Sequence, residues 1–194
     1  MCRPRPARGP RGRGPPHPER LRLHAVGSSA TSLLVRPAEH RDVPALVRLR
    51  LANAERHVQL APDIYRVPDV EAVARHFEQA LADGVKVLIS VAEMAGEVVG
   101  MAEVVLLDDP PDHQILIPRR RADIHTVVLD GHRGRGVGSA LAAAAEQAAA
   151  DQGVSILYAG VFAPNKEAAS FYAASGFAPR GILLSKETTV PAGE

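Results

Sequence analysis

The chain has 194 residues, of which 46% are hydrophobic and 23% are charged, and this length and composition suit one well-packed globular domain. No run of about 20 apolar residues is present to cross a bilayer and no secretory apolar core lies near the start, so we expect a cytoplasmic protein without a membrane segment. The single cysteine, Cys2, excludes a disulfide framework and a thiolate metal site.

An arginine-rich segment opens the chain. Residues 1–28 contain seven arginines and one acid, a net charge of +6, which leaves −5 for the remainder because the whole chain carries +1. Six prolines and few large apolar residues predict a disordered tail over residues 1–30, followed by one domain at 31–188 and a short tail at 189–194. Such arginines suit nucleic acid, but proline and glycine interrupt the basic face and no aromatic residue is present to stack on bases. Nucleic-acid binding is therefore the weaker interpretation.

The first half of the domain has clear local patterns. Residues 32–37 form a β-type run, and Asp42 is the expected N-cap of a helix with apolar positions along residues 43–51. Helical spacing of apolar residues predicts a second helix over 70–83, which Gly84 ends.

The second half alternates strands and helices. Two β-rich arms with a tight turn around residues 95–97 predict a hairpin. The elements expected after it are a strand at 122–129, a helix at 138–150, a strand at 154–162 and a helix at 166–175. This order predicts a mixed α/β fold with a central sheet.

A glycine-rich stretch, HRGRGVGSAL at residues 132–141, joins a strand to a helix. Unpaired amides and the positive end of the helix dipole meet at such a point, and this suits a phosphate group. A P-loop is excluded, because Val137 stands where that motif requires lysine. The dinucleotide fingerprint fits weakly, because Ser139 replaces its last glycine and no acid follows the next strand.

Two motifs in order carry a family resemblance. Arg133, Gly136 and Gly138 form R-x-x-G-x-G, and the pattern N-x-x-A-x-x-F-Y-x-x-x-G-F runs from Asn165 to Phe177. Over residues 32–187 the sequence resembles the Gcn5-related N-acetyltransferase (GNAT) family. The resemblance implies an α/β fold whose mostly antiparallel central sheet is splayed between its fourth and fifth strands, with a thioester cofactor in the opening.

The resemblance also implies how acetyl-CoA, as co-substrate, would bind. The pantetheine arm is expected to pair with backbone groups of Val127, Val128 and Leu129. The pyrophosphate is expected on amides of the segment comprising Arg133, Gly134, Arg135, Gly136, Val137, Gly138 and Ser139. Asn165 is expected to cap the following helix and to line the cleft. The loop after Leu129 is one residue shorter than the family usually has, so the strand contacts can shift by one position.

The expected chemistry needs two proton transfers. An alkylamine, with a pKa of about 10.4, must lose a proton before it attacks a thioester, and the leaving thiolate departs more easily once protonated. The resemblance implies that Tyr172 is the general acid. The neighbouring Phe171 is interpreted as a buried aromatic. Asp123 and His125 alternate on one face of their strand and are the candidate bases, directly or through a water, with Glu103 a further candidate.

The sequence therefore predicts a single-domain acyl-CoA N-acyltransferase that most simply acetylates a primary amine by direct attack in a ternary complex. The alternative is a non-catalytic acyl-CoA-binding module, which would keep the glycine-rich segment and have no use for Tyr172. The histidines have no partners at metal-ligand spacing, so no metal is expected. Relatives commonly dimerise, which allows a homodimer, and the identity of the amine stays open.

Overall fold

Four α-helices surround a five-stranded sheet in the computed structural model, which describes residues 32–186 and residue 188. The strands are β1 (Leu33–Pro37), β2 (Val87–Met94), β3 (Glu97–Leu107), β4 (Arg121–Val128) and β5 (Ile156–Tyr158). The helices are α1 (Val43–Leu60), α2 (Val70–Asp83), α3 (Val137–Asp151) and α4 (Lys166–Ala174), with short 3₁₀ turns η1 (His40–Asp42) and η2 (Asp130–His132). The two predicted tails lie outside the described residues: residues 1–30, with Cys2 and the arginine-rich segment, and residues 189–194.

The sheet has the order β1-β2-β3-β4-β5. The first four strands are antiparallel, and only β5 runs parallel to its neighbour β4. This arrangement confirms the expected mixed α/β fold with a mostly antiparallel sheet. The turn between β2 and β3 places Ala95 at φ 52° and Gly96 at φ 80°, the left-handed pair that suits a two-residue hairpin turn.

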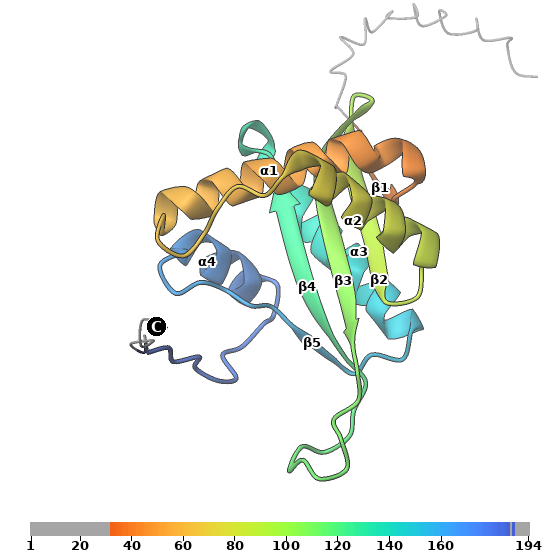
Figure 1. The fold of residues 1–194 in the computed structure, drawn as a ribbon. Coiled ribbons are helices and arrows are strands. Elements are labelled where there is room, and N and C mark those ends of the chain that lie inside the picture. The colour runs from red at the N-terminus through yellow and green to blue at the C-terminus, as the bar shows by residue number, and fades with distance from the viewer. Residues whose placement is uncertain (1–31, 187, 189–194) are drawn as a thin grey trace, which may run out of the picture. The chain divides into compact units, whose positions relative to one another are not determined.

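The fourth and fifth strands separate soon after they meet. Pairing runs from Arg121 opposite Ile156 to Asp123 opposite Tyr158 and then stops. In Figure 1, the chain after β5 leads away from β4 toward α4, so the second half of β4 has a neighbour on one side only. The strand expected over 154–162 is accordingly only three residues long, because its later residues have left the sheet.

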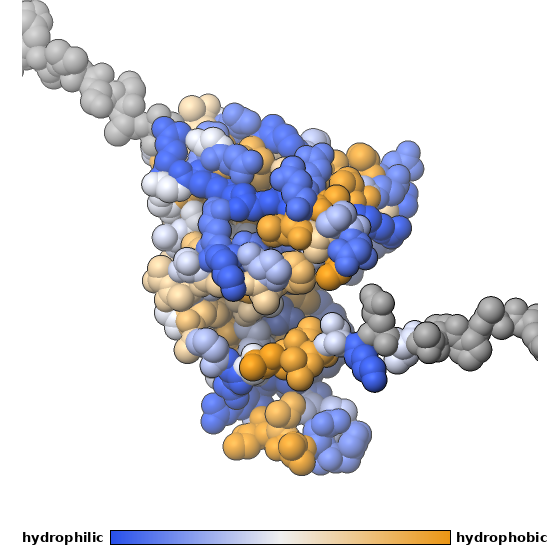
Figure 2. All heavy atoms as spheres, turned by 90° about the vertical axis from the view of Figure 1, so that its left-hand side faces the viewer, coloured by the Kyte–Doolittle hydropathy of each residue, from blue (hydrophilic) through white to orange (hydrophobic). Residues whose placement is uncertain are grey.

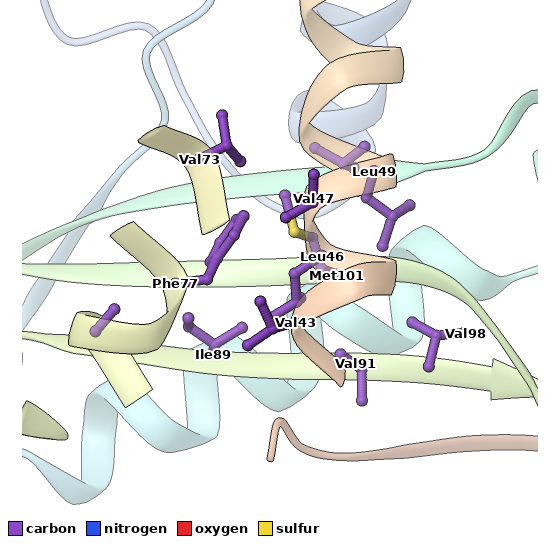
Figure 3. Close-up of a cluster of buried hydrophobic side chains, with 12 residues drawn as sticks. Val43, Leu46, Val47, Leu49, Val73, Phe77, Ile89, Val91, Val98 and Met101 are labelled. Carbon is purple, nitrogen blue, oxygen red and sulfur yellow. The ribbon is translucent and has the colours of Figure 1, made fainter. Parts of the chain in front are cut away.

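Helices cover both faces of the sheet (Figure 1). α1 and α2 lie on one face, where Phe77, Leu46 and Met101 are fully buried in a cluster that Figure 3 shows in close-up. α3 lies on the other face, where Leu141 and Val137 pack against the sheet. Along β4, Val127 therefore belongs to the α1–α2 face, whereas Ala122 and Ile124 belong to the α3 face.

Asp42 departs from its expected role. It does occupy the N-cap position of α1, but its side chain does not bind the first turn of that helix. Its carboxylate accepts hydrogen bonds from both terminal nitrogens of Arg36, at 2.7 and 2.9 Å, and from the Glu39 amide at 2.8 Å. The residue thus ties η1 to β1, and α1 continues past the predicted face to Leu60.

Two hydrophobic segments are exposed. Ile115, Leu116 and Ile117 lie in the β3–β4 loop, and Ile182, Leu183 and Leu184 follow α4. Figure 2 shows hydrophobic atoms at the lower end of the molecule, where that loop lies in Figure 1. No helix within the described ranges combines the length and apolar character that crossing a bilayer requires.

Candidate cofactor and catalytic site

The free edge of β4 is the foundation of the site. Backbone groups along a strand point alternately to its two sides. The Leu129 amide donates to the Val99 carbonyl of β3 at 3.0 Å, so this residue faces the sheet. Thr126 and Val128, at alternate positions, turn their amides and carbonyls toward the gap between β4 and β5.

Two side chains of the protein occupy this edge. The Tyr172 hydroxyl accepts a hydrogen bond from the Thr126 amide at 3.2 Å and donates to the Ile124 carbonyl at 3.5 Å. Two residues further along the strand, Arg133 Nε donates to the Val128 carbonyl at 3.1 Å. Of the backbone groups at this free edge, the Thr126 amide and the Val128 carbonyl are therefore bound by side chains of the protein itself.

The alternation differs from the strand contacts expected from the sequence. Val127 and Leu129 point their backbone groups at β3, because the β3–β4 register is continuous from Arg121 to Val128 without a bulge. Of the three expected residues, Val128 alone presents its backbone to the gap, and Thr126 takes the place of Val127.

A cavity of about 320 Å³ opens beside this edge. It gathers residues from β4, the β4–α3 loop, α4 and α1. Its lining includes most of the predicted site residues, namely Val127, Val128, Arg133, Gly134, Gly136, Gly138, Ser139, Asn165 and Tyr172. Leu129, Arg135 and Val137 of the predicted set do not line it, and neither do Asp123 and His125.

The N-terminus of α3 forms one wall of the cavity. Gly136 caps the helix at φ 81°, a conformation that other residues rarely adopt. The first helical hydrogen bond runs from Ala140 to Gly136, which leaves the amides of Val137, Gly138 and Ser139 without partners in the helix. The first turn contains no acidic residue, so the positive end of the helix dipole is not neutralised there.

Gly138 allows α4 to approach α3. A Cβ atom added to Gly138 would lie 3.0 Å from Cε2 of Phe171. Phe171 was interpreted from the sequence as a buried aromatic, but it is partly exposed and lines the cavity, and Tyr172 is the buried member of the pair. Gly138 and Phe171 thus fix the width of the cavity between the two helices.

Tyr172 is held rigidly. Its ring packs edge-on against Phe171 and Phe177, with centroids 4.9 and 5.2 Å away. Burial raises the pKa of its hydroxyl above the usual 10.0, and the hydrogen bond from Thr126 opposes this shift only in part. The phenol is therefore protonated throughout the neutral range. Asn165 caps α4 by accepting from the Ala168 amide at 3.1 Å, as predicted.

The three candidate bases differ in their surroundings. Asp123 and His125 share the face of β4 that carries Val127, toward α1 and α2. Asp123 lies in the last pair that β4 makes with β5, whereas His125 lies beyond it and is exposed. Glu103, opposite His125 in the sheet, is buried, and its carboxylate is held by Arg50 and by His76 Nε2 at 3.2 Å.

The sequence did not point to several lining residues. Asn53 and Arg56 come from α1, and Glu167 comes from the first turn of α4. Arg56 lies beside Glu167 and within 3.5 Å of Asp130, and Arg133 contacts both of these carboxylates at 3.1 Å. No motif marks α1, and only the polar character of one of its faces was available as a signal.

The sequence of this region also matches a known protein family. The sequence profile of the acetyltransferase (GNAT) family matches residues 54–177, which include β4, the glycine-rich loop and α4. The chain belongs to the GNAT acetyltransferase family. Within residues 32–186, no three His, Cys, Asp or Glu side chains gather in a metal-binding arrangement.

Solved structures share the GNAT fold. The BH1408 protein from Bacillus halodurans has a TM-score of 0.72 and 22% identity, with 80% of this chain and 99% of that chain covered. The aminoglycoside N-acetyltransferase AAC(6')-Iy, solved in complex with CoA, has a TM-score of 0.65 and 18% identity, covering 85% and 100%. A predicted acetyltransferase from Clostridium acetobutylicum, solved with acetyl-CoA, has a TM-score of 0.62 and 17% identity, covering 80% and 96%. Among the curated proteins, no significant match was found.

Proposed function

We propose that this GNAT protein transfers the acetyl group of acetyl-CoA to a primary amine by direct attack in a ternary complex. The observation that carries the proposal is the meeting of three features in one cavity: the free edge of β4, the N-terminus of α3 with its amides free of any side-chain cap, and the phenol of Tyr172. Two structurally similar proteins were solved with CoA or acetyl-CoA, and this supports the same class of cofactor here.

The N-terminus of α3 is the proposed pyrophosphate site. The unpartnered amides of Val137, Gly138 and Ser139 supply donors, and the helix dipole favours negative charge. Gly134 and Gly136 carry no side chains that would block the approach, and both have a positive φ. Arg133 and Arg135 add positive charge to the same loop.

The pantetheine arm is proposed to lie along the free edge of β4. Its amide groups match the spacing of a strand, so that they pair with Thr126 and Val128 as a short additional strand. The arm would replace the Tyr172 hydroxyl on the Thr126 amide and Arg133 on the Val128 carbonyl. The thioester then lies beside Tyr172, at the point where β4 and β5 part.

Tyr172 is the proposed general acid. The deprotonated amine nitrogen attacks the thioester carbonyl carbon, the carbon–sulfur bond breaks and the phenol proton passes to the leaving sulfur, while the second proton that the nitrogen loses as the amide forms restores the phenol. A free thiol has a pKa of about 8.5, below that of the buried phenol, so the phenol assists departure by hydrogen bonding to the sulfur as charge develops there, and the proton moves only if a second proton reaches the phenol oxygen.

His125 is the proposed general base, which removes the ammonium proton of the acceptor. It lies on β4 immediately before Thr126 and beyond the last β4–β5 pair, and its side chain is exposed on the α1–α2 face without lining the cavity, so it would act through a water. Asp123 is the alternative base, but it lies where β4 is still paired with β5, away from the free edge. The carboxylate of Glu103 is buried and already bound by Arg50 and His76, and it does not line the cavity.

A thiol-release assay distinguishes this function from a non-catalytic acyl-CoA-binding module. The purified protein is mixed with acetyl-CoA and a panel of chemically diverse primary amines, and free thiol is measured. An enzyme releases thiol in proportion to product on at least one amine. A binding module is stabilised by acetyl-CoA but releases no thiol above the uncatalysed background on any amine.

A homodimer is also proposed. Ile182, Leu183 and Leu184 follow α4 with almost fully exposed side chains, an unusual state for three consecutive large hydrophobic residues. Burying this segment against a second copy removes it from water. Light scattering after size exclusion tests the proposal: twice the monomer mass supports the dimer, and the monomer mass at all concentrations contradicts it.

A further inference from the structure

Four charged side chains form a closed ring at the cavity, which we call the charge ring: Arg56, Glu167, Arg133 and Asp130. Glu167 receives Arg56 on one carboxylate oxygen and Arg133 on the other, the latter at 3.1 Å. Asp130 receives Arg133 at 3.1 Å and Arg56 at 3.5 Å through the same oxygen. The ring thereby connects α1, α4 and the β4–α3 loop.

The positive and the negative side chains of the charge ring differ in their exposure to solvent. The arginine side chains are only 30–31% exposed, whereas the carboxylates of Glu167 and Asp130 are 60% and 87% exposed. Both arginines line the cavity. The arginines are therefore fixed in the wall, and the carboxylates can leave them for water at small cost because exposed ion pairs contribute little free energy.

The ring also holds Arg133 in place over the strand edge. The same guanidinium that contacts Glu167 and Asp130 donates its Nε to the Val128 carbonyl. In the free protein the carboxylates of the ring are thus the anions that occupy this arginine pair.

We propose that Arg56 is a further phosphate-binding residue, and that Glu167 is an internal anion which the phosphate groups of the cofactor displace from Arg56 and Arg133. The inference rests on the proposed function, since it needs a cofactor that bears phosphates. Arg56 on α1 then faces the amides of α3 across the cavity, and both sides contribute to binding one polyanion. Displacement also frees Arg133 to release the Val128 carbonyl to the pantetheine arm.

Calorimetry with two probes tests this inference on the wild-type protein and three variants. The probes are CoA and pantetheine, which lacks phosphate. Arg56→Gln is expected to weaken CoA binding by about tenfold, the loss of one charged hydrogen-bonding group. Glu167→Gln is expected to tighten CoA binding by about two- to fivefold, since the competing anion is gone. Neither variant is expected to change pantetheine binding by as much as twofold.

Glu55→Gln is the matched control, because it removes an exposed carboxylate from α1 next to Arg56 without touching the ring. It should leave CoA binding unchanged. Glu167 is exposed enough for its variant to fold, which a thermal unfolding curve verifies. Unchanged or weaker CoA binding by Glu167→Gln, in a wild-type protein that binds CoA, overturns this inference alone. Absence of CoA binding by the wild-type protein overturns the proposed function and this inference with it.

Discussion

The hydroxyl oxygen of Tyr172 lies 3.2 Å from the backbone nitrogen of Thr126, at the place where β4 has lost β5 as a neighbour. A side chain from α4 thereby completes the hydrogen bonding of a strand edge that the fold leaves open. The same contact brings the proposed acid next to the proposed path of the thioester. A strand that parts from its neighbour thus creates both the binding edge and the place for the chemistry.

Replacement of Tyr172 by phenylalanine should lower kcat by about 100-fold, because the leaving thiolate loses its proton donor. KM for acetyl-CoA should not rise, since the phenol no longer competes for the Thr126 amide. Steady-state kinetics of thiol release checks both values. Tyr158→Phe, on β5, is the matched control and should retain wild-type kcat. A Tyr172→Phe enzyme with full kcat would rule out the acid role.

His125→Gln should reduce kcat/KM by about 100-fold near neutral pH, because the amide cannot take the ammonium proton of the acceptor. Asp123→Asn should cost less than about tenfold, since that residue lies where β4 is still paired with β5 and therefore away from the free edge. A pH–rate profile for each variant makes the comparison. The reverse order of the two losses would assign the base to Asp123.

Gly138→Val should weaken CoA binding by at least about tenfold, because its side chain meets Phe171 where even a Cβ lies 3.0 Å from the ring. Gly131→Ala, in the loop before α3, should bind CoA normally, as a Cβ there meets nothing within 4 Å. Titration calorimetry compares the two variants. Equal affinity in Gly138→Val would show that the approach of α4 to α3 does not shape the cofactor site.

The ion pair between Asp42 and Arg36 stabilises the protein, and its loss in acid should lower the free energy of unfolding. Arg36 holds the pKa of this carboxyl below its usual value of 3.8, so the stabilisation is complete above that pH and is lost as the pH falls through the lower folded value. Asp42→Asn should cost about 3 kcal/mol at neutral pH and flatten this dependence. Urea unfolding between pH 7 and pH 3 measures it. Asp112→Asn, in an exposed loop, should behave as wild type, and an equally acid-sensitive Asp42→Asn protein would refute the assignment.

Periodicity in the sequence was sufficient to predict most elements of the fold. Gly84 ends α2 in a left-handed conformation and Asn165 caps α4, as their local chemistry predicts. The short β5 was not predicted, because Ala159–Phe162 are as apolar as a buried strand, and only the divergence of the sheet keeps them out of it. Asp42 formed an ion pair in place of a cap, because its partner Arg36 comes from a strand that local patterns cannot bring near it.

The candidate site was predicted where a motif covers it and missed elsewhere. Arg133, Gly136 and Asn165 line the cavity, and each belongs to a motif with a local physical reason. Arg56 and Glu167 meet only after α1 and α4 have packed, more than a hundred positions apart in the sequence. The sequence also could not predict the strand register, because the pairing with β3 decides whether the backbone groups of Val127 or of Thr126 face the gap.

Titration calorimetry of the purified wild-type protein with CoA and acetyl-CoA tests the central claim most directly. The account predicts saturable binding of both ligands at one site per chain, lost or strongly weakened in Gly138→Val and retained in Gly131→Ala. No heat of binding with either ligand, in a protein shown to be folded by a cooperative unfolding transition, would contradict it.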